Sequence, residues 1–221
     1  MKSPLPDVVC VLACAAAIIA MFSIFSPARA EAGPDYLKEK PDSSPVATFA
    51  GGCFWCIESE FRPLPGVLFT IVGYTQGKTQ NPTYDDVSTG DTGHAEALEI
   101  YFDPQKITYE QLVEHFLKRA HDPTELNKQW VDKGTQYRSG IYYHDAEQHK
   151  IAQGMIDRLT AEKYFKRPIM TEVKPAVTFW PAEEYHQNYY DRYQETYGQV
   201  HRRVTAKKEI KKEREKERLS R

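Results

Sequence analysis

Between residues 46 and 200, short runs of apolar residues alternate with segments whose apolar positions recur every three or four residues. The first pattern is typical of strands and the second of amphipathic helices. The runs that predict strands are residues 46–50, 66–74, 95–102, 139–144 and 169–179. The segments that predict helices are residues 53–61, two segments that open at Thr108 and Asp145, and residues 182–193. Strands and helices therefore alternate along the chain.

The two internal helices carry start signals. Gln111 follows Thr108 by three residues, which is the capping-box pattern. Asp145 and Gln148 repeat this spacing with Asp as the N-cap. The resulting order is β-α-β-β-α-β-α-β-α, and its first six elements match the ferredoxin-like split βαβ pattern. We therefore expect an α+β fold, a two-layer sandwich of helices on an antiparallel or mixed sheet with additional C-terminal elements.

The first thirty residues have the features of a secretory signal. Lys2 precedes an apolar run over residues 8–25, and the Ala-Arg-Ala sequence at 28–30 follows it as a signal-peptidase site. The run is longer than a signal usually needs, so an uncleaved membrane anchor stays open, as does lipidation at Cys14. We expect cleavage after Ala30 and export, with the periplasm as the destination.

The remaining chain divides into a polar, Pro-containing linker at residues 31–45, one domain at residues 46–200 and a charged tail at residues 201–221. With 41% hydrophobic and 27% charged residues, the composition is that of a globular protein. It excludes a collagen, a long disordered chain and a polytopic membrane protein. A formal net charge of −2 shows no general basic excess, so we expect no nucleic-acid partner. Nothing in the sequence requires more than a monomer.

Cleavage of the leader would leave Cys53 and Cys56 as the cysteines of the mature chain. The strand, the two glycines and the helix that follow one another here place Cys53 near the first turn of the helix. Backbone N–H groups and the helix dipole favour a thiolate at that position. Cys56 lies one turn later and could reach the Cys53 sulfur once that sulfur becomes electrophilic. A structural disulfide and a pair of buried core thiols are the alternatives.

The segment GGCFWCIESEF at residues 51–61 resembles the active-site segment of the A-type peptide-methionine sulfoxide reductases. Six further segments continue this resemblance in the family order. They are Gly73-Tyr74, Asn81-Pro82-Thr83-Tyr84, Thr92-Gly93-His94-Ala95-Glu96, His121-Asp122-Pro123-Thr124, the stretch from Asp132 to Ser139, and the stretch from Ala182 to Gln187. Because the resemblance spans residues 45–195 in separate segments, it is far more specific than a CxxC pair alone.

This resemblance implies an enzyme that reduces the S epimer of methionine sulfoxide, free or in proteins, with no cofactor and no metal. By analogy Cys53 attacks the sulfoxide sulfur and becomes a sulfenic acid. Glu96 supplies a proton or a strong hydrogen bond to the sulfoxide oxygen, and Tyr84 and Tyr137 donate further hydrogen bonds. Glu96 can serve only if its pKa is raised enough to keep it protonated near pH 7. Taken by itself, Glu96 would be a solvated residue of a half-buried, alternating strand.

The resemblance also assigns the residues around these groups. Phe54 and Trp55 hold the S-methyl group of the substrate, and Asp132 orients the site by hydrogen bonding. The family usually has Gly where this chain has Cys56, and many members have further cysteines near the C-terminus, which this chain lacks. The two departures compensate if Cys56 resolves the sulfenic acid as a disulfide. Gly is also common in the family where this chain has Trp130, a difference that the sequence does not explain.

A thioredoxin-like protein is the implied reductant of that disulfide. Thioredoxin is the usual donor for the family. An exported enzyme cannot meet the cytoplasmic pool, so a periplasmic thioredoxin-like protein is the natural partner.

Three other classes of protein share single features with this chain. A thioredoxin-like oxidoreductase also has CxxC at a helix start, but no convincing candidate for its cis-Pro loop is present. A zinc deaminase is suggested by His94-Ala95-Glu96, but its P-C-x-x-C should follow that motif, whereas the CxxC here precedes it. A non-enzymatic binding module would leave Cys53 without a role. We interpret His94, His121 and His186 as residues that satisfy local backbone groups.

Overall fold

The computed structural model of the protein describes residues 35–199 and, beyond them, residues 209, 212 and 216. The predicted leader, the start of the predicted linker and most of the charged tail lie outside the described residues. The chain has two compact units, and the short 3-10 helix η2 (Asp35–Glu39) spans the boundary between them at Glu39. No helix in the described part combines the length and apolar character that a membrane span requires.

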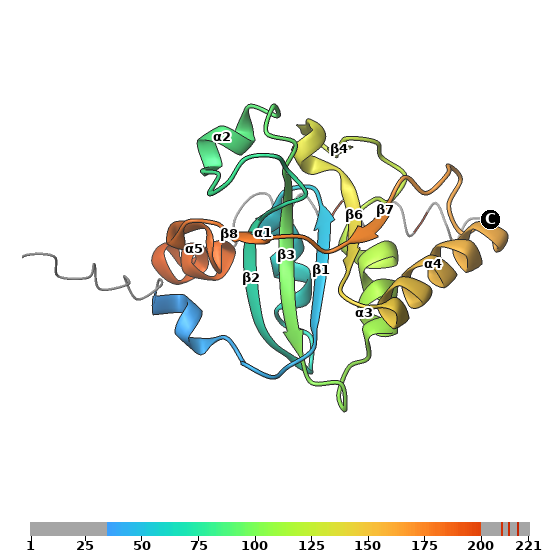
Figure 1. The fold of residues 1–221 in the computed structure, drawn as a ribbon, viewed down its shortest axis with the longest axis horizontal. Helices are drawn as coiled ribbons and strands as arrows, with labels where there is room; N and C mark the ends of the chain where they lie inside the picture. The colour runs from blue at the N-terminus through green and yellow to red at the C-terminus, as the bar shows by residue number, and fades with distance from the viewer. Residues whose placement is uncertain (1–34, 200–208, 210–211, 213–215, 217–221) are drawn as a thin grey trace, which may run out of the picture. The chain divides into compact units, whose positions relative to one another are not determined.

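The second unit is built on a six-stranded sheet with the strand order β7-β6-β1-β3-β2-β8 (Figure 1). Neighbouring strands are antiparallel except for β6 and β7, which are parallel. The sheet is therefore mixed, and the predicted α+β fold is confirmed. The strands are β1 (Val46–Gly51), β2 (Val67–Thr75), β3 (Ala95–Phe102), β6 (Ser139–Tyr143), β7 (Glu172–Pro175) and β8 (Trp180–Pro181).

The four predicted helices appear in the expected order along the chain, and a further helix, α2 (Tyr84–Ser88), and several short elements are additions that the sequence did not predict. Thr108 forms the predicted capping box with Gln111, and Asp145 accepts the N–H of Gln148 at 2.8 Å. The helices are α1 (Phe54–Phe61), α2 (Tyr84–Ser88), α3 (Tyr109–His115), α4 (Ala146–Ala161) and α5 (Tyr189–Tyr197). The other additions are the hairpin of β4 (Lys128–Gln129) and β5 (Asp132–Lys133), the π-helix η3 (Phe116–Ala120), and the 3-10 helices η4 (Thr135–Tyr137) and η5 (Glu184–His186).

The main hydrophobic core lies between one face of the sheet and helices α1, α3 and α4. Phe49 of β1 stacks on Phe116 there, with 4.7 Å between the ring centroids. The segment between β7 and β8 covers the other face of the sheet and runs in front of it in Figure 1. Phe179 of this segment packs beside the small residues Ala95 and Ala97. Because both of its faces are covered, β3 is buried along most of its length, and the predicted half-buried strand is wrong.

The C-terminal elements differ from the prediction. The strand predicted at residues 169–179 ends at Pro175, and β8 is a separate short strand. The helix predicted at residues 182–193 is split, because Asn188 has a left-handed backbone (φ 53°) between η5 and α5. The amide of Gln187 bonds both the N–H and the C=O of Val72 at 3.0 Å, as a neighbouring strand would. This long-range pairing overrides the helical periodicity of the segment.

Candidate active site

Cys53 lies at the junction between β1 and α1. Its carbonyl accepts the N–H groups of Cys56 at 2.9 Å and Ile57 at 3.2 Å, and Cys53 is the N-cap of the helix. The preceding Gly52 has φ 94°, and a Cβ at this position would collide with the side chain of Gln129. Only glycine suits both constraints. The turn therefore fixes where the Cys53 thiol lies.

The Cys53 thiol is buried and protonated in the resting site. The side-chain hydrogen bond with Cys56 raises the pKa of Cys53 well above its ordinary value, and burial and the charges of Cys56 and Glu96 raise it further. The backbone N–H of Cys56 lowers this pKa, as expected at a helix start, but it is outweighed. The helix start therefore favours the Cys53 thiolate, as predicted, but the Cys56 side chain and burial outweigh it in the resting site.

Glu96 lies beside Cys53 in the core. Its carboxylate accepts the backbone N–H of Phe54, the residue after Cys53, at 2.9 Å. Glu96 is only 3% exposed. Leu98 follows it by two residues along β3, so both side chains lie on the face of the strand that packs against the helices. The alternative that Glu96 is a solvated strand residue is therefore wrong. Burial opposes the charged form of such a carboxyl, and the Phe54 N–H favours it.

Tyr84, Tyr137 and Asp132, the other residues predicted for the site, lie near Cys53 and Glu96. Burial raises the pKa of Tyr137, and the charges of Glu96 and Tyr84 raise it further. Asp132 and Cys53 also raise the pKa of Tyr137, by smaller amounts. Because such effects act over short distances, Glu96, Tyr84, Asp132 and Cys53 all lie in the neighbourhood of the Tyr137 phenol. The raised pKa keeps the Tyr137 hydroxyl available as a donor at neutral pH.

Two loop segments hold the tyrosines in place. Tyr84 is the first residue of α2, and its N–H donates to the carboxylate of Glu183 at 2.9 Å. Tyr137 ends η4, which is tied to the end of α2 by the bond from the Gln136 amide to the Ser88 carbonyl at 3.2 Å. The two phenols are therefore positioned by contacts between segments far apart in the sequence.

Phe54 and Trp55 form an aromatic wall with Tyr84 and His186. The His186 ring lies 5.2 Å from the Phe54 ring and 4.5 Å from the Tyr84 ring, between centroids. The Trp55 indole donates to His186 Nδ1 at 3.2 Å, so the proton of the neutral ring is on Nε2, 3.8 Å from Glu183. Burial lowers the pKa of His186 to about 4, which keeps the ring neutral at pH 7.

Cys56 lies on α1, one turn after Cys53. Both residues are free thiols and both are buried. The Cys56 sulfur lies 3.2 Å from the hydroxyl of Tyr190 on α5. The next residue back along α5, Tyr189, stacks on Trp55 with 4.0 Å between the ring centroids. The C-terminal helix is therefore in direct contact with the cysteine pair.

His94 and His121 bond nearby backbone groups, as predicted. His94 accepts the N–H of Gly77 at 3.1 Å and bonds the carbonyl of Thr79 at 2.9 Å. His121 bonds the carbonyl of Phe116 at 2.9 Å. Within the described part of the chain, no group of three or more His, Cys, Asp and Glu residues is arranged to hold a metal ion.

The structure explains Trp130 and adds residues that sequence reasoning missed. Trp130 has φ 53°, in the left-handed region that glycine adopts most easily. Glu183 and His186 belong to the segment AEEYHQ, so its resemblance was a signal that could have assigned them to the site. Tyr190 lies beyond that segment, and nothing in the sequence distinguishes it from the other tyrosines.

The assembled site has a defined chemical capacity. It offers a sulfur nucleophile, a buried acid, two phenols and an apolar wall within one cluster. Such a set can hold a small group with an apolar methyl end and donate hydrogen bonds to its oxygen while the sulfur attacks. A second thiol stands ready beside the first, so the cluster can also close a disulfide.

Comparison with known proteins gives a consistent result. A family model described as peptide methionine sulfoxide reductase matches residues 45–218. The peptide methionine sulfoxide reductase MsrA of Acidobacterium capsulatum is 60% identical over 141 residues, which cover 64% of this chain and 90% of that protein. The enzyme of Geobacter sulfurreducens is 49% identical over 142 residues, covering 64% and 87%.

Two solved structures resemble the fold closely. Methionine sulfoxide reductase A of Corynebacterium diphtheriae has a TM-score of 0.62 at 34% identity, covering 70% of this chain and 77% of that chain. The reduced form of Mxr1 from Saccharomyces cerevisiae has a TM-score of 0.64 at 34% identity, and the match covers 69% of this chain and 87% of that chain. The similarity therefore extends from the sequence to the arrangement of the elements.

Proposed function

The chain belongs to the peptide methionine sulfoxide reductase family, a family of oxidoreductases, and from this membership we propose that it reduces the S epimer of methionine sulfoxide, free or in proteins. The observation that carries the proposal is the 2.9 Å hydrogen bond from the Phe54 N–H to Glu96. This bond places an acid next to the residue that bears the nucleophilic sulfur. A sulfoxide whose sulfur meets Cys53 then has its oxygen within reach of Glu96.

In the first step the Cys53 sulfur attacks the sulfoxide sulfur. The S–O bond of the substrate breaks, methionine leaves, and the oxygen remains on Cys53 as a sulfenic acid. A thiol and a sulfoxide give a sulfenic acid and a thioether, so the atoms balance without a cofactor. The raised pKa of Cys53 keeps its thiol protonated at rest, so the thiol must lose its proton during attack. Glu96 gives a proton to the sulfoxide oxygen and takes the thiol proton in return, so the proton count balances and Glu96 ends unchanged.

The charge that builds on the sulfoxide oxygen needs several donors. Glu96 supplies the proton, and the hydroxyls of Tyr84 and Tyr137 donate hydrogen bonds to the same atom. Asp132 lies close enough to raise the pKa of Tyr137, and we assign it the orientation of that phenol. The aromatic wall of Phe54 and Trp55 receives the S-methyl group and excludes water.

In the second step Cys56 resolves the sulfenic acid. It forms a disulfide with Cys53, and a thioredoxin-like dithiol protein reduces that disulfide to restore the free thiols. The support is the direct side-chain hydrogen bond between Cys53 and Cys56 in the reduced site. Since every group named comes from one chain, we infer that the monomer is sufficient for the cycle.

We propose further that the protein is exported. The support is the apolar run at residues 8–25 and the Ala-Arg-Ala sequence that follows it. The reductant would then be a periplasmic thioredoxin-like protein, and the substrates would be exported proteins with oxidised methionines. N-terminal sequencing of the exported protein should begin at Glu31, and a sequence that begins at Met1 would exclude cleavage.

The reaction itself is tested with the two pure epimers of methionine sulfoxide. Purified protein with dithiothreitol should reduce the S epimer and leave the R epimer unchanged. If both epimers are consumed equally, the assignment of the S epimer as the substrate is wrong. If neither epimer is consumed although both thiols are reduced at the start, the proposed activity is wrong.

A further inference from the structure

Tyr190 of α5 contacts the second cysteine of the site. Its hydroxyl oxygen lies 3.2 Å from the Cys56 sulfur, a distance at which either group can donate a hydrogen bond to the other. Tyr190 is 7% exposed and Cys56 is 5% exposed, so both side chains of this contact are largely shielded from bulk water. Cys53, Cys56 and Tyr190 form one buried cluster in the core. The Tyr190 phenol therefore belongs to the environment of the thiol pair.

Several contacts between α1 and α5 hold Tyr190 in this position. The N–H of Asn188 donates to the buried carboxylate of Glu58 at 3.0 Å. On the other side of Tyr190, Asp191 pairs with Arg62 at 3.3 Å. Both Glu58 and Arg62 lie on or directly after α1, the helix that carries Cys56. The phenol is thus held from both sides against the helix that bears its partner.

We propose that Tyr190 is a positioning residue for the disulfide-forming step: it orients the Cys56 thiol toward oxidised Cys53 and donates a hydrogen bond to the Cys56 sulfur as that sulfur loses its proton. The proposal rests on the resolving role of Cys56 given above. It deepens that role by adding a side chain from α5, a helix far away in the sequence, that contacts the Cys56 sulfur.

The step balances as follows. The Cys56 sulfur attacks the sulfur of the Cys53 sulfenic acid, the S–O bond of Cys53 breaks and the S–S bond forms. The Cys53 sulfur is reduced and the Cys56 sulfur is oxidised. The proton of the Cys56 thiol ends on the departing hydroxyl, which leaves as water. Because a hydrogen bond to the charged form of an acid favours that form, the Tyr190 hydroxyl, 3.2 Å from the Cys56 sulfur, lowers the cost of forming the Cys56 thiolate.

The test separates the two chemical steps in Tyr190→Phe. Reduced protein receives one equivalent of the S epimer without a reductant. The methionine released reports the first step, and the loss of trap-reactive sulfenic acid together with the loss of both thiols reports the second. We expect the disulfide-forming step to slow on the order of tenfold, which is the size expected for one hydrogen bond to a charged group. We also expect its pH profile to move to higher pH.

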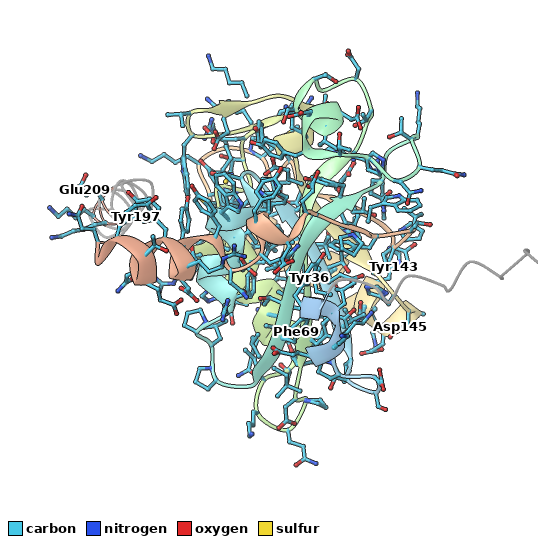
Figure 2. The ribbon with its side chains drawn as sticks, turned by 90° about the vertical axis from the view of Figure 1, so that its left-hand side faces the viewer. Tyr36, Phe69, Tyr143, Asp145, Tyr197 and Glu209 are labelled. Carbon is cyan, nitrogen blue, oxygen red and sulfur yellow. The ribbon has the colours of Figure 1, made fainter. Side chains whose placement is uncertain are left out.

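Tyr197→Phe is the matched control. Tyr197 ends the same helix and is 63% exposed, and Figure 2 shows this end of α5 projecting away from the sheet. The same loss of a hydroxyl at this position should leave both steps at the parent rates. If Tyr190→Phe forms the disulfide at the parent rate with the parent pH profile, the proposal fails. It also fails if both steps slow equally, since that result indicates a general packing role.

Cys56→Ser distinguishes this proposal from the function on which it rests. That variant should release methionine once and then stop with sulfenic acid on Cys53. If it instead sustains full turnover with a dithiol protein donor, the resolving role of Cys56 is wrong, whatever Tyr190→Phe does. If Cys56→Ser stops as expected while Tyr190→Phe behaves like the parent, only the role of Tyr190 is wrong.

Discussion

At the scale of the residue, the resting site holds the Cys53 thiol, the Tyr137 phenol and the His186 ring in their neutral forms. The pKa of Cys53 is raised, that of Tyr137 is raised, and that of His186 is lowered to about 4. In each case burial is among the largest causes, because burial in a low dielectric opposes charge. In the proposed reaction the sulfoxide oxygen enters this buried site, where donors placed beforehand would need little reorganisation as charge develops on it.

Glu96→Gln tests the acid directly. Glutamine keeps the size of the side chain and can still accept the Phe54 N–H, but it cannot give a proton to the sulfoxide oxygen. We expect the rate of methionine release in a single turnover to fall by about 10²–10⁴-fold, the usual worth of a general acid. Glu99→Gln on the opposite face of β3 is the control and should keep the parent rate. A near-normal rate in Glu96→Gln would remove Glu96 from the mechanism.

At the scale of the element, the site depends on the turn between β1 and α1 and on the docking of α5 against α1. The turn needs glycine at position 52, whose φ is 94°. The docking uses the buried carboxylate of Glu58, which accepts the Thr70 hydroxyl and the Asn188 N–H, both at 3.0 Å. Burial raises the pKa of Glu58 to about 7. The turn and the helix docking therefore both position the reactive cysteines and contribute to the stability of the fold.

Gly52→Ala should destabilise the fold by about 2 kcal/mol or more. The substitution adds backbone strain at a positive φ and a collision with Gln129. Gly154→Ala in α4 is the opposite case, because a Cβ there meets nothing within 4 Å. It should stabilise the protein by about 0.5–1 kcal/mol through helix propensity. Urea unfolding measures both changes, and equal effects of the two substitutions would contradict the assignment.

Glu58→Gln tests the pH dependence of this docking. Because the folded pKa of about 7 lies above the ordinary 4.5, Glu58 stabilises the fold fully below pH 4.5 and this stability is lost as pH rises through 7. The loss amounts to about 3 kcal/mol at 1.36 kcal/mol per pKa unit. His186, with its lowered pKa of about 4, acts in the opposite sense as pH falls below 6.5, so only the difference between the parent and Glu58→Gln isolates Glu58.

The free energy of unfolding should therefore be compared at pH 5 and pH 8 in both proteins. We expect the parent to lose stability relative to Glu58→Gln on going from pH 5 to pH 8. If the difference between the two proteins is the same at both pH values, Glu58 does not change its charge in this range.

At the scale of the whole molecule, the site joins the first third of the fold to its last elements. The order of the strands and helices along the chain, the N-caps at Thr108 and Asp145, and the α+β class could be predicted because they follow from local patterns. The cluster around Cys53 could be predicted only through the resemblance, because Glu96 and Tyr137 meet through folding and not through spacing. The split at Asn188 and the role of Tyr190 could not be predicted, because distant partners on α1 and β2 fix them.

The measurement that tests the account most directly is methionine release in a single turnover by the parent and by Cys53→Ala. Each protein is reduced, freed of reductant and given the S epimer of methionine sulfoxide. The parent should release one methionine per chain and Cys53→Ala should release none, although the variant keeps its fold. If Cys53→Ala releases methionine at the parent rate, the oxygen does not pass to this sulfur and the proposed chemistry is wrong.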